Sequence, residues 1–208
     1  MGRADALFRF DERLNGKKEI VIAGVDEAGR GPLAGPVVAA AVIFRRRVSL
    51  AELDDSKKLT SKTRERLFGS IALHAWVGIG QASEEVIDEV NILEATKLAM
   101  QKALLALPRT PDLVLIDGRI HLNLPLPQRA VVRGDGRSAS IAAASVIAKV
   151  YRDHWMEQLD QTYPDYGFAR HKGYPTRFHL AALRQKGATE VHRRSFRPVR
   201  EVLERTAQ

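Results

Sequence analysis

Five short apolar segments along the chain predict β-strands. Residues 19–26 and 36–44 are almost continuously apolar, which is typical of strands buried in the middle of a sheet. Residues 75–81, 113–116 and 130–132 are further segments of strand character. The first two segments are joined by a turn rich in glycine and proline, so we expect the chain to open with a meander of three strands.

Apolar residues at helical spacing lie between and after these segments. Residues 61–73 predict a charged helix, and Ser83 is a suitable N-cap for a long helix that Pro108 ends. Ser138 opens an alanine-rich helix that must pack closely along much of its length. Residues 176–185 predict one more helix. This order of elements favours an α/β or α+β domain.

The character of the chain changes near residue 160, where it becomes irregular and basic. We therefore expect a main domain over residues 1–160 and a basic, helical extension over residues 161–208. The chain has 33 Lys and Arg against 25 Asp and Glu, and from Arg170 onward ten cations face three Glu. Such an excess favours a polyanionic partner, chiefly nucleic acid. A solvated basic tail is the simpler alternative.

Composition also limits the chemistry and the location. There is no cysteine, so any metal must be held by oxygen or imidazole. The longest apolar run, residues 33–44, is well short of the roughly 20 residues that cross a bilayer. Residues 1–10 lack the apolar core of a signal peptide. We expect a cytoplasmic protein with no membrane partner, and a monomer by default.

Three aspartates stand where predicted strands end. Asp26 closes the first strand, and Asp117 and Asp135 follow the last two. Ligands of open sheets gather at the ends of neighbouring strands, so these carboxylates are expected to converge. Close carboxylates repel one another unless cations neutralise them, and an all-oxygen site favours Mg²⁺ or Mn²⁺. Alternatively, each acid is a solvated residue at a strand end or turn.

Glu27 belongs to this set only if the backbone changes direction. Adjacent residues of a regular strand point to opposite faces, so Asp26 and Glu27 can serve one site only if the strand breaks there. The following Gly29-Arg30-Gly31-Pro32 is expected to supply that break. Glycine permits unusual backbone angles, and proline cannot extend a strand ladder.

The same glycines also satisfy a dinucleotide-binding pattern. That function requires a helix to begin at the loop, whereas a valine-rich strand is predicted here. Asp26 and Glu27 would also repel a pyrophosphate at close range. We therefore favour a loop in which Gly29 and Gly31 bring the backbone close to a substrate, while Arg30 meets a phosphate or braces the turn.

Two further loops carry groups suited to nucleic acid. Ser56, Lys57 and Lys58 place a hydroxyl and two ammonium groups before a helix, which suits phosphate contacts, although a solvated capping loop has the same composition. Lys172 and Tyr174 combine a cation with an aromatic ring that can stack on a sugar or base. Tyr174 can equally be a half-buried packing residue.

Taken together, these motifs resemble bacterial ribonuclease HII, a type 2 ribonuclease H family. The resemblance runs in order from about residue 19 to residue 198. It rests on VDEAGRGPLAGPV at 25–37, DSKKL at 55–59, LIDG at 115–118, GDGRSASIAAASVIAKVYRD at 134–153 and YGFARHKGYPT at 166–176. The arginines at 45–47 and the segment 188–190 depart from the family pattern, and neither touches a catalytic motif.

The resemblance implies an α/β, ribonuclease H-like fold with a mixed five-stranded sheet, flanking helices and a C-terminal helical extension. It implies an endonuclease that hydrolyses the RNA strand of RNA-DNA hybrids and cuts at single ribonucleotides in duplex DNA, using two Mn²⁺ or Mg²⁺ ions. The products would be a 3′-hydroxyl and a 5′-phosphate. The implied catalytic metal ligands are Asp26, Glu27, Asp117 and Asp135. The implied substrate contacts are Gly29, Arg30, Gly31 and Tyr174 at the RNA-DNA junction, with Ser56, Lys57, Lys58 and Lys172 nearby.

Two alternative functions share part of the pattern. Another nuclease of this fold, such as a type 1 hybrid nuclease or a junction resolvase, would share the acids but has no reason to carry the GRG and HKGY motifs. A noncatalytic nucleic-acid-binding module would explain the charge. It would not explain four acids at strand ends, which oppose binding of a polyanion unless metals are present.

Overall fold

The computed structural model describes residues 2–14, 20–50 and 52–206. Five strands form one sheet in the order β3-β2-β1-β4-β5. The antiparallel neighbours are β1 (Ile22–Ala28), β2 (Val37–Phe44) and β3 (Ala75–Ala82). Two further strands run parallel to β1, namely β4 (Leu113–Asp117) and β5 (Gln128–Val131). The mixed sheet and its opening meander are confirmed; Glu19, at the predicted start of the first strand, lies outside the described residues.

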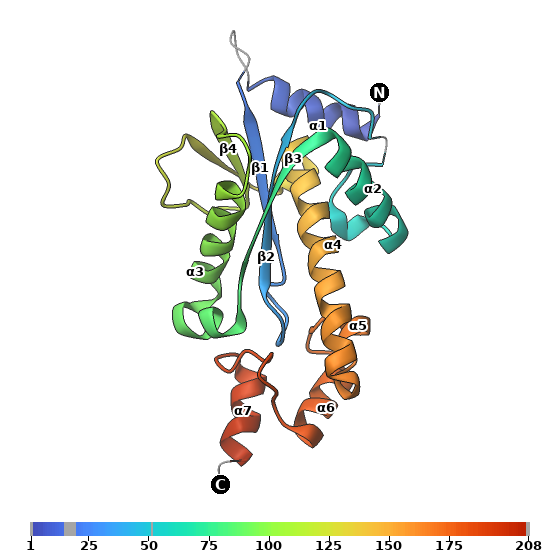
Figure 1. Ribbon diagram of the computed structural model, residues 1–208, viewed down its shortest axis with the longest axis vertical. Coiled ribbons are helices and arrows are strands. Elements are labelled where there is room, and N and C mark those ends of the chain that lie inside the picture. The colour runs from blue at the N-terminus through green and yellow to red at the C-terminus, as the bar shows by residue number, and fades with distance from the viewer. Residues whose placement is uncertain (1, 15–19, 51, 207–208) are drawn as a thin grey trace.

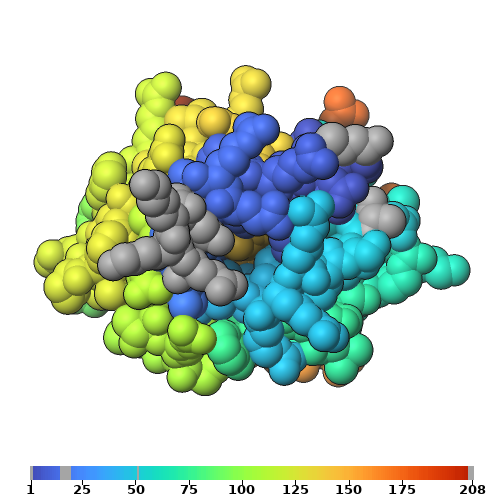
Figure 2. All heavy atoms as spheres, turned by 90° about the horizontal axis from the view of Figure 1, so that it is seen from above, coloured from blue at the N-terminus to red at the C-terminus, as the bar shows by residue number. Residues whose placement is uncertain are grey.

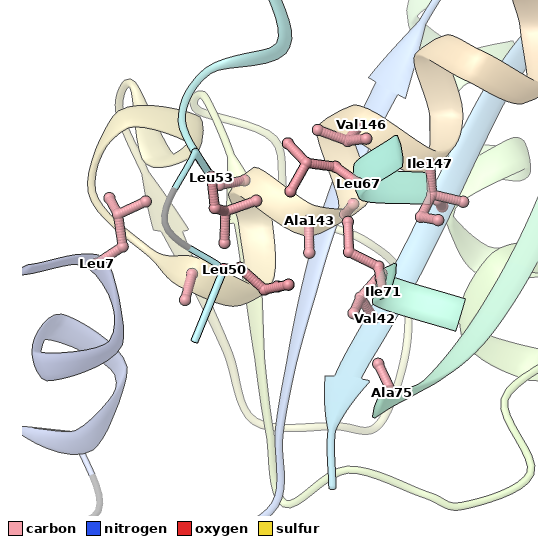
Figure 3. Packing of buried hydrophobic residues seen from close by; sticks show 14 of the residues in the cluster. Leu7, Val42, Leu50, Leu53, Leu67, Ile71, Ala75, Ala143, Val146 and Ile147 are labelled. Carbon is pink, nitrogen blue, oxygen red and sulfur yellow. The ribbon is translucent and has the colours of Figure 1, made fainter. Parts of the chain in front are cut away.

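Helices cover both faces of the sheet (Figure 1). One face packs against α3 (Glu84–Leu105) and the other against α4 (Ala139–Thr162), with α1 (Arg3–Glu12) and α2 (Ser61–His74) beside α4. Figure 3 shows this second core, where Val42 of β2 lies among the helix residues Leu67, Ile71, Ala143, Val146 and Ile147, and Leu7 of α1 lies on the far side of Leu50 and Leu53. The sequence pattern did not predict α1, which buries only one short apolar side.

Small residues hold α4 very close to β1. Ala142, Ala143 and Ala144 are fully buried, as the alanine-rich sequence predicts. A Cβ atom at Gly24 of β1 would lie 2.1 Å from the backbone carbon of Ser140 in α4. The N-terminal turns of α4 therefore lie directly on the middle of β1, close to the strand ends that carry the predicted acids.

The long helix α3 is not continuous, which corrects the sequence-based expectation. Asn91 has a φ angle of 71°, in the left-handed region, and interrupts the helix. Its Oδ1 atom accepts hydrogen bonds from the amides of Leu93 and Glu94, at 2.9 and 3.2 Å. Asn91 therefore acts as an internal cap that begins the second part of α3.

The chain after α4 is helical and lies beside the end of the sheet at which β1 leads into β2 (Figure 1). It contains η3 (Pro164–Tyr166), α5 (Phe168–His171), α6 (Arg177–Lys186) and α7 (Arg197–Thr206). Thr176 caps α6 where the sequence predicts a helix, whereas α7 was not predicted. In the described part of the chain, no helix has the length and apolar character needed to cross a membrane.

Candidate active site

Two of the predicted catalytic acids project from the face of the sheet that α4 covers. Ile22 of β1 and Leu115 of β4 both pack with Ile141 of α4. Side chains alternate along a strand, so Asp26 and Asp117, four and two residues further on, point to the same face. The two strands are parallel neighbours, and both acids lie just beyond their last paired residues.

Asp135 joins them from η2 (Gly134–Gly136), the turn that leads toward α4. Asp117 orients this turn, because its Oδ1 accepts a 2.6 Å hydrogen bond from the amide of Gly134. In Asp26 and Asp135, Oδ1 accepts from the amide of the following residue, at 2.7 and 2.9 Å. The backbone thus fixes one oxygen of each aspartate, and Oδ2 is the atom available to a ligand.

The pKa values of these acids reflect their closeness to one another. Burial raises the pKa of Asp26 well above its usual value, and the carboxylates of Glu27, Asp117 and Asp135 raise it further. Burial also raises the pKa of Asp135, and Asp117 adds to the rise. Such mutual repulsion requires a neutralising cation, and here the Lys57 ammonium approaches to 3.6 Å from Asp135 Oδ2.

Glu27 reaches the cluster without the strand break that the sequence predicts. Glu27 still pairs with Ala39 in the ladder to β2, and the first left-handed residue is Gly29, with a φ of 95°. The prediction of a break at the acid pair is therefore wrong. Burial raises the pKa of Glu27 despite the opposing charge of Arg30, whose Nη1 is 3.3 Å from Glu27 Oε1, and Asp117 adds to the rise.

The glycine loop that follows β1 faces an exposed aromatic ring. A Cβ atom added to Gly31 would lie 3.4 Å from Cε1 of Tyr174, and 46% of Tyr174 is exposed. The backbone of Tyr174 is held by the buried His179, whose Nδ1 lies 3.0 Å from the Tyr174 carbonyl oxygen. The backbone of the glycine loop and the Tyr174 ring therefore face each other across one part of the surface, next to the acids.

Comparison with known proteins decides the family. A family model described as Ribonuclease HII matches residues 23–199. Ribonuclease HII of Geobacillus kaustophilus (strain HTA426) is 55% identical over 207 residues, which cover 99% of this chain and 79% of that protein. Ribonuclease HII of Chlamydia caviae is 54% identical over 196 residues, which cover 93% of this chain and 92% of that protein. The chain belongs to the ribonuclease HII family.

Solved structures agree with this assignment. Ribonuclease H2 from Pyrococcus horikoshii OT3 superposes with a TM-score of 0.77 at 27% identity, covering 91% of this chain and 100% of that one. Bst-RNase HIII in complex with Mn²⁺, at 16% identity and a TM-score of 0.65, shares the fold; 97% of this chain and 72% of that one are covered. As a ribonuclease HII, the chain is an endonuclease that hydrolyses the RNA of RNA-DNA hybrids. The family depends on divalent metal ions.

The four acids of this ribonuclease HII chain suit a hard divalent cation, because all their donor atoms are carboxylate oxygens. Residues 2–14, 20–50 and 52–206 nevertheless contain no group of three or more Asp, Glu or His side chains arranged to hold an ion as they stand. Metal binding would require the Oδ2 atoms to turn toward one another. It would also displace Lys57 from Asp135.

The other predicted substrate residues differ in their exposure and in the partners of their side chains. Lys57 and Lys58 are exposed at the start of the loop before α2, although Lys58 lies 3.6 Å from Asp54. The Ser56 hydroxyl is buried 2.6 Å from Ser145 Oγ, so it supports the loop instead of facing outward as expected. Lys172 is also engaged, because its ammonium is 2.6 Å from Glu157 Oε1.

The sequence analysis missed two residues beneath the glycine loop. Arg152 and Arg193 are 1% and 0% exposed. Counting charges placed Arg193 in a basic extension expected to meet nucleic acid, and the pattern gave no reason to separate it from its neighbour Arg194.

A large hollow lies at the other end of the sheet. It has a volume of about 490 Å³, and its walls include Trp76, Arg109, Asp11 and the arginines 45–47. Figure 2 looks onto this end, where α1 lies beside the segment that follows β2. None of the four acids lines it.

Proposed function

We propose that Asp26, Glu27, Asp117 and Asp135 form the metal-dependent catalytic centre of this ribonuclease HII. The observation that carries the proposal is that backbone amides orient three aspartates, Asp26, Asp117 and Asp135, and that Asp117 is close enough to raise the pKa of the other two. Bound cations stabilise the charged form of such a cluster at neutral pH. Two divalent ions, Mn²⁺ or Mg²⁺, would activate water and stabilise the leaving 3′ oxygen when bound there.

The residues of the chain then have separate tasks. The Asp26, Asp117 and Asp135 side chains are each held at Oδ1 by a backbone amide, which leaves Oδ2 of each to turn toward a bound ion. Glu27 is steadied by Arg30 at the edge of the cluster. Lys57, which is exposed and beside the acids, is placed to meet a phosphate once cations neutralise the site.

Recognition of RNA requires a test for the 2′-hydroxyl. The glycine loop suits this test because backbone groups make hydrogen bonds that do not depend on base identity. Tyr174 can stack against the next sugar, where a deoxyribose fits more easily than a ribose. The face formed by Gly31 and Tyr174 thereby supports cleavage at RNA-to-DNA junctions, including a single ribonucleotide within duplex DNA, without sequence preference.

One gel tests this function. A labelled DNA duplex with a single embedded ribonucleotide is incubated with the protein in Mg²⁺, in Mn²⁺ and in a chelator, beside a matched all-DNA duplex. We expect cutting at the 5′ side of the ribonucleotide with metal only, and an intact all-DNA duplex. Cutting in chelator, cutting of the all-DNA duplex, or no cutting with either metal would refute the proposal.

A further inference from the structure

The buried arginines beneath the glycine loop bind backbone rather than carboxylates. In the part of the chain that the structure describes, neither Arg152 nor Arg193 forms an ion pair. Burial lowers the pKa of Arg193 to about 9 and that of Arg152 to about 10, so both remain charged at neutral pH. A buried charge without a counter-ion is costly, and here the compensation comes from carbonyl groups.

Arg193 binds the loop at both of its ends. Its Nη2 donates to the carbonyls of Gly29 at 2.6 Å and Gly35 at 2.7 Å. Its Nη1 donates to those of Arg30 at 3.1 Å and Pro32 at 2.8 Å, and Nε donates to Gly35 at 2.9 Å. A rigid guanidinium fork can hold several acceptors in one arrangement, which a flexible ammonium cannot.

These bonds determine where the loop amides point. In a trans peptide the N–H group points opposite to the preceding carbonyl, and the described chain has no cis peptide. Because the carbonyls of Gly29 and Arg30 point inward to Arg193, the amides of Arg30 and Gly31 point outward. Within the described residues, neither amide has a hydrogen-bond acceptor. Both donors are therefore available to a substrate.

Arg152 ties the same loop to the segment that carries the aromatic ring. Its Nε and Nη2 donate to the carbonyls of Pro36 and Ala34, at 2.9 and 3.0 Å, and its Nη1 donates to that of Lys172 at 3.0 Å. A Cβ atom at Gly29 would be 2.0 Å from Arg152 Nε, so the loop rests directly on this side chain. Arg152 thereby fixes the distance between the glycine loop and the segment that carries Tyr174.

Arg193 is itself anchored from α3. The carboxylate of Asp88 accepts hydrogen bonds from the amides of Arg194 and Ser195, both at 2.8 Å, and from the Ser195 hydroxyl at 2.5 Å. Asp88 lies in the first part of α3, before the interruption at Asn91. A continuous chain of contacts thus runs from α3 through the tail to the glycine loop.

We propose that Arg193 is a positioning residue for ribose recognition, which presents the amides of Arg30 and Gly31 to the substrate, and that Asp88 holds Arg193 in place. This inference rests on the proposed function, because it assigns a task to a loop that the proposed function already places against the ribose. Arg193, a buried charge of the C-terminal segment, would then serve specificity for ribose and not general affinity for polyanions.

The test is a ratio of two cleavage rates measured with excess enzyme. One substrate is a duplex with a single embedded ribonucleotide, and the other is a continuous RNA-DNA hybrid. The hybrid offers a ribose at every position of its RNA strand, whereas the duplex with a single ribonucleotide offers only one. A misplaced loop should therefore slow cleavage of the hybrid less than cleavage at the single ribonucleotide. Simple loss of folded protein lowers both rates equally and leaves the ratio unchanged.

We expect Arg193→Gln to lower the single-ribonucleotide rate at least about tenfold more than the hybrid rate. Arg193→Lys, which keeps the charge and three donors, should recover part of the ratio. Asp88→Asn should lower the ratio in the same direction while leaving Arg193 intact. The matched control is Arg194→Gln, an exposed neighbour, which should keep the wild-type ratio.

The variants also separate this inference from the function on which it rests. If Arg193→Gln does not fold, Asp88→Asn alone tests the positioning role. The Asp88 side chain is only partly buried, so this variant should fold. A wild-type ratio in both, with a lowered ratio in Tyr174→Ala, would overturn the positioning role and keep the junction-reading site. A wild-type ratio in Tyr174→Ala as well would overturn both.

Discussion

The exposed ring of Tyr174 faces Gly31 so closely that a methyl group at Gly31 would touch it, at 3.4 Å from Cε1. Gly31 does not have a left-handed φ, so alanine fits its backbone without strain. We predict that Gly31→Ala folds with an unchanged melting temperature but cleaves an embedded ribonucleotide at least about tenfold more slowly, because the methyl group obstructs the approach of the sugar. Single-turnover rates at wild-type levels would show that the sugar does not enter there.

Gly24 supports the site from within the fold. A Cβ atom there would clash with the backbone of α4, at 2.1 Å from Ser140, and backbone cannot rotate away. Gly24→Ala should lower the free energy of unfolding by about 3 kcal/mol, measured in urea. The control is Gly69→Ala in α2, where a Cβ meets nothing within 4 Å and helix propensity should add about 0.5–1 kcal/mol. Equal stabilities for the two variants would contradict this account of the packing.

Buried histidines should make the fold sensitive to acid. Nε2 of His192 lies 3.1 Å from Nε2 of His179, and burial lowers their pKa values to about 3 and about 4. A depressed folded-state pKa gives stability that is present above the unfolded value of about 6.5 and is lost as the pH falls toward 3. The free energy of unfolding should therefore decline between pH 7 and pH 4.

The variant His192→Gln isolates this contribution. Its decline with falling pH should be shallower than that of the wild type, whereas His121→Gln, at an exposed position, should follow the wild type. Asp26 and Asp135, with raised pKa values, oppose the trend equally in all three proteins. Parallel curves for wild type and His192→Gln would show that this histidine does not control the acid response.

The salt dependence of duplex binding distinguishes lysines that contact phosphate from lysines that only form ion pairs within the fold. Lys57 is exposed, and although burial opposes its charge, Asp26 and Asp135 raise its pKa. Lys57→Ala should reduce the slope of log Kd against log salt by about 1, because one fewer counterion is released on binding. Lys186→Ala, whose ammonium already pairs with Asp165 at 2.9 Å, should leave the slope unchanged. Identical slopes for Lys57→Ala and wild type would remove Lys57 from the phosphate contacts.

Sequence reasoning found the aspartates because two independent regularities coincide. β1 and β4 are recognisable by their continuous apolar residues, so Asp26 and Asp117 at their ends were expected at one end of the sheet, whereas Asp135 lies beyond β5 in η2. It did not find the path of Glu27, because β1 keeps its ladder to β2 beyond the point where its ladder to β4 ends. The apolar pattern of one strand cannot show which of its two neighbouring strands stops pairing with it first.

The buried arginines could not be found in this way. An arginine is almost always at the surface, so residue type alone assigns it there. Arg193 is buried because five carbonyl contacts converge on it from a loop more than 150 residues away in sequence. Such a convergence depends on the tertiary fold, and neither hydrophobic pattern nor local spacing records it.

The central claim is that the acid cluster is the metal-dependent catalytic centre. Asp26→Asn keeps the side-chain shape and its acceptor for the Glu27 amide but removes the charge. Single-turnover cleavage of an embedded ribonucleotide in Mn²⁺ should fall about a thousandfold, a barrier increase of about 4 kcal/mol, while Kd for the duplex stays near wild type. Glu89→Gln, an exposed charge removal on α3, should cleave normally. Cleavage by Asp26→Asn within a few fold of wild type would contradict the claim.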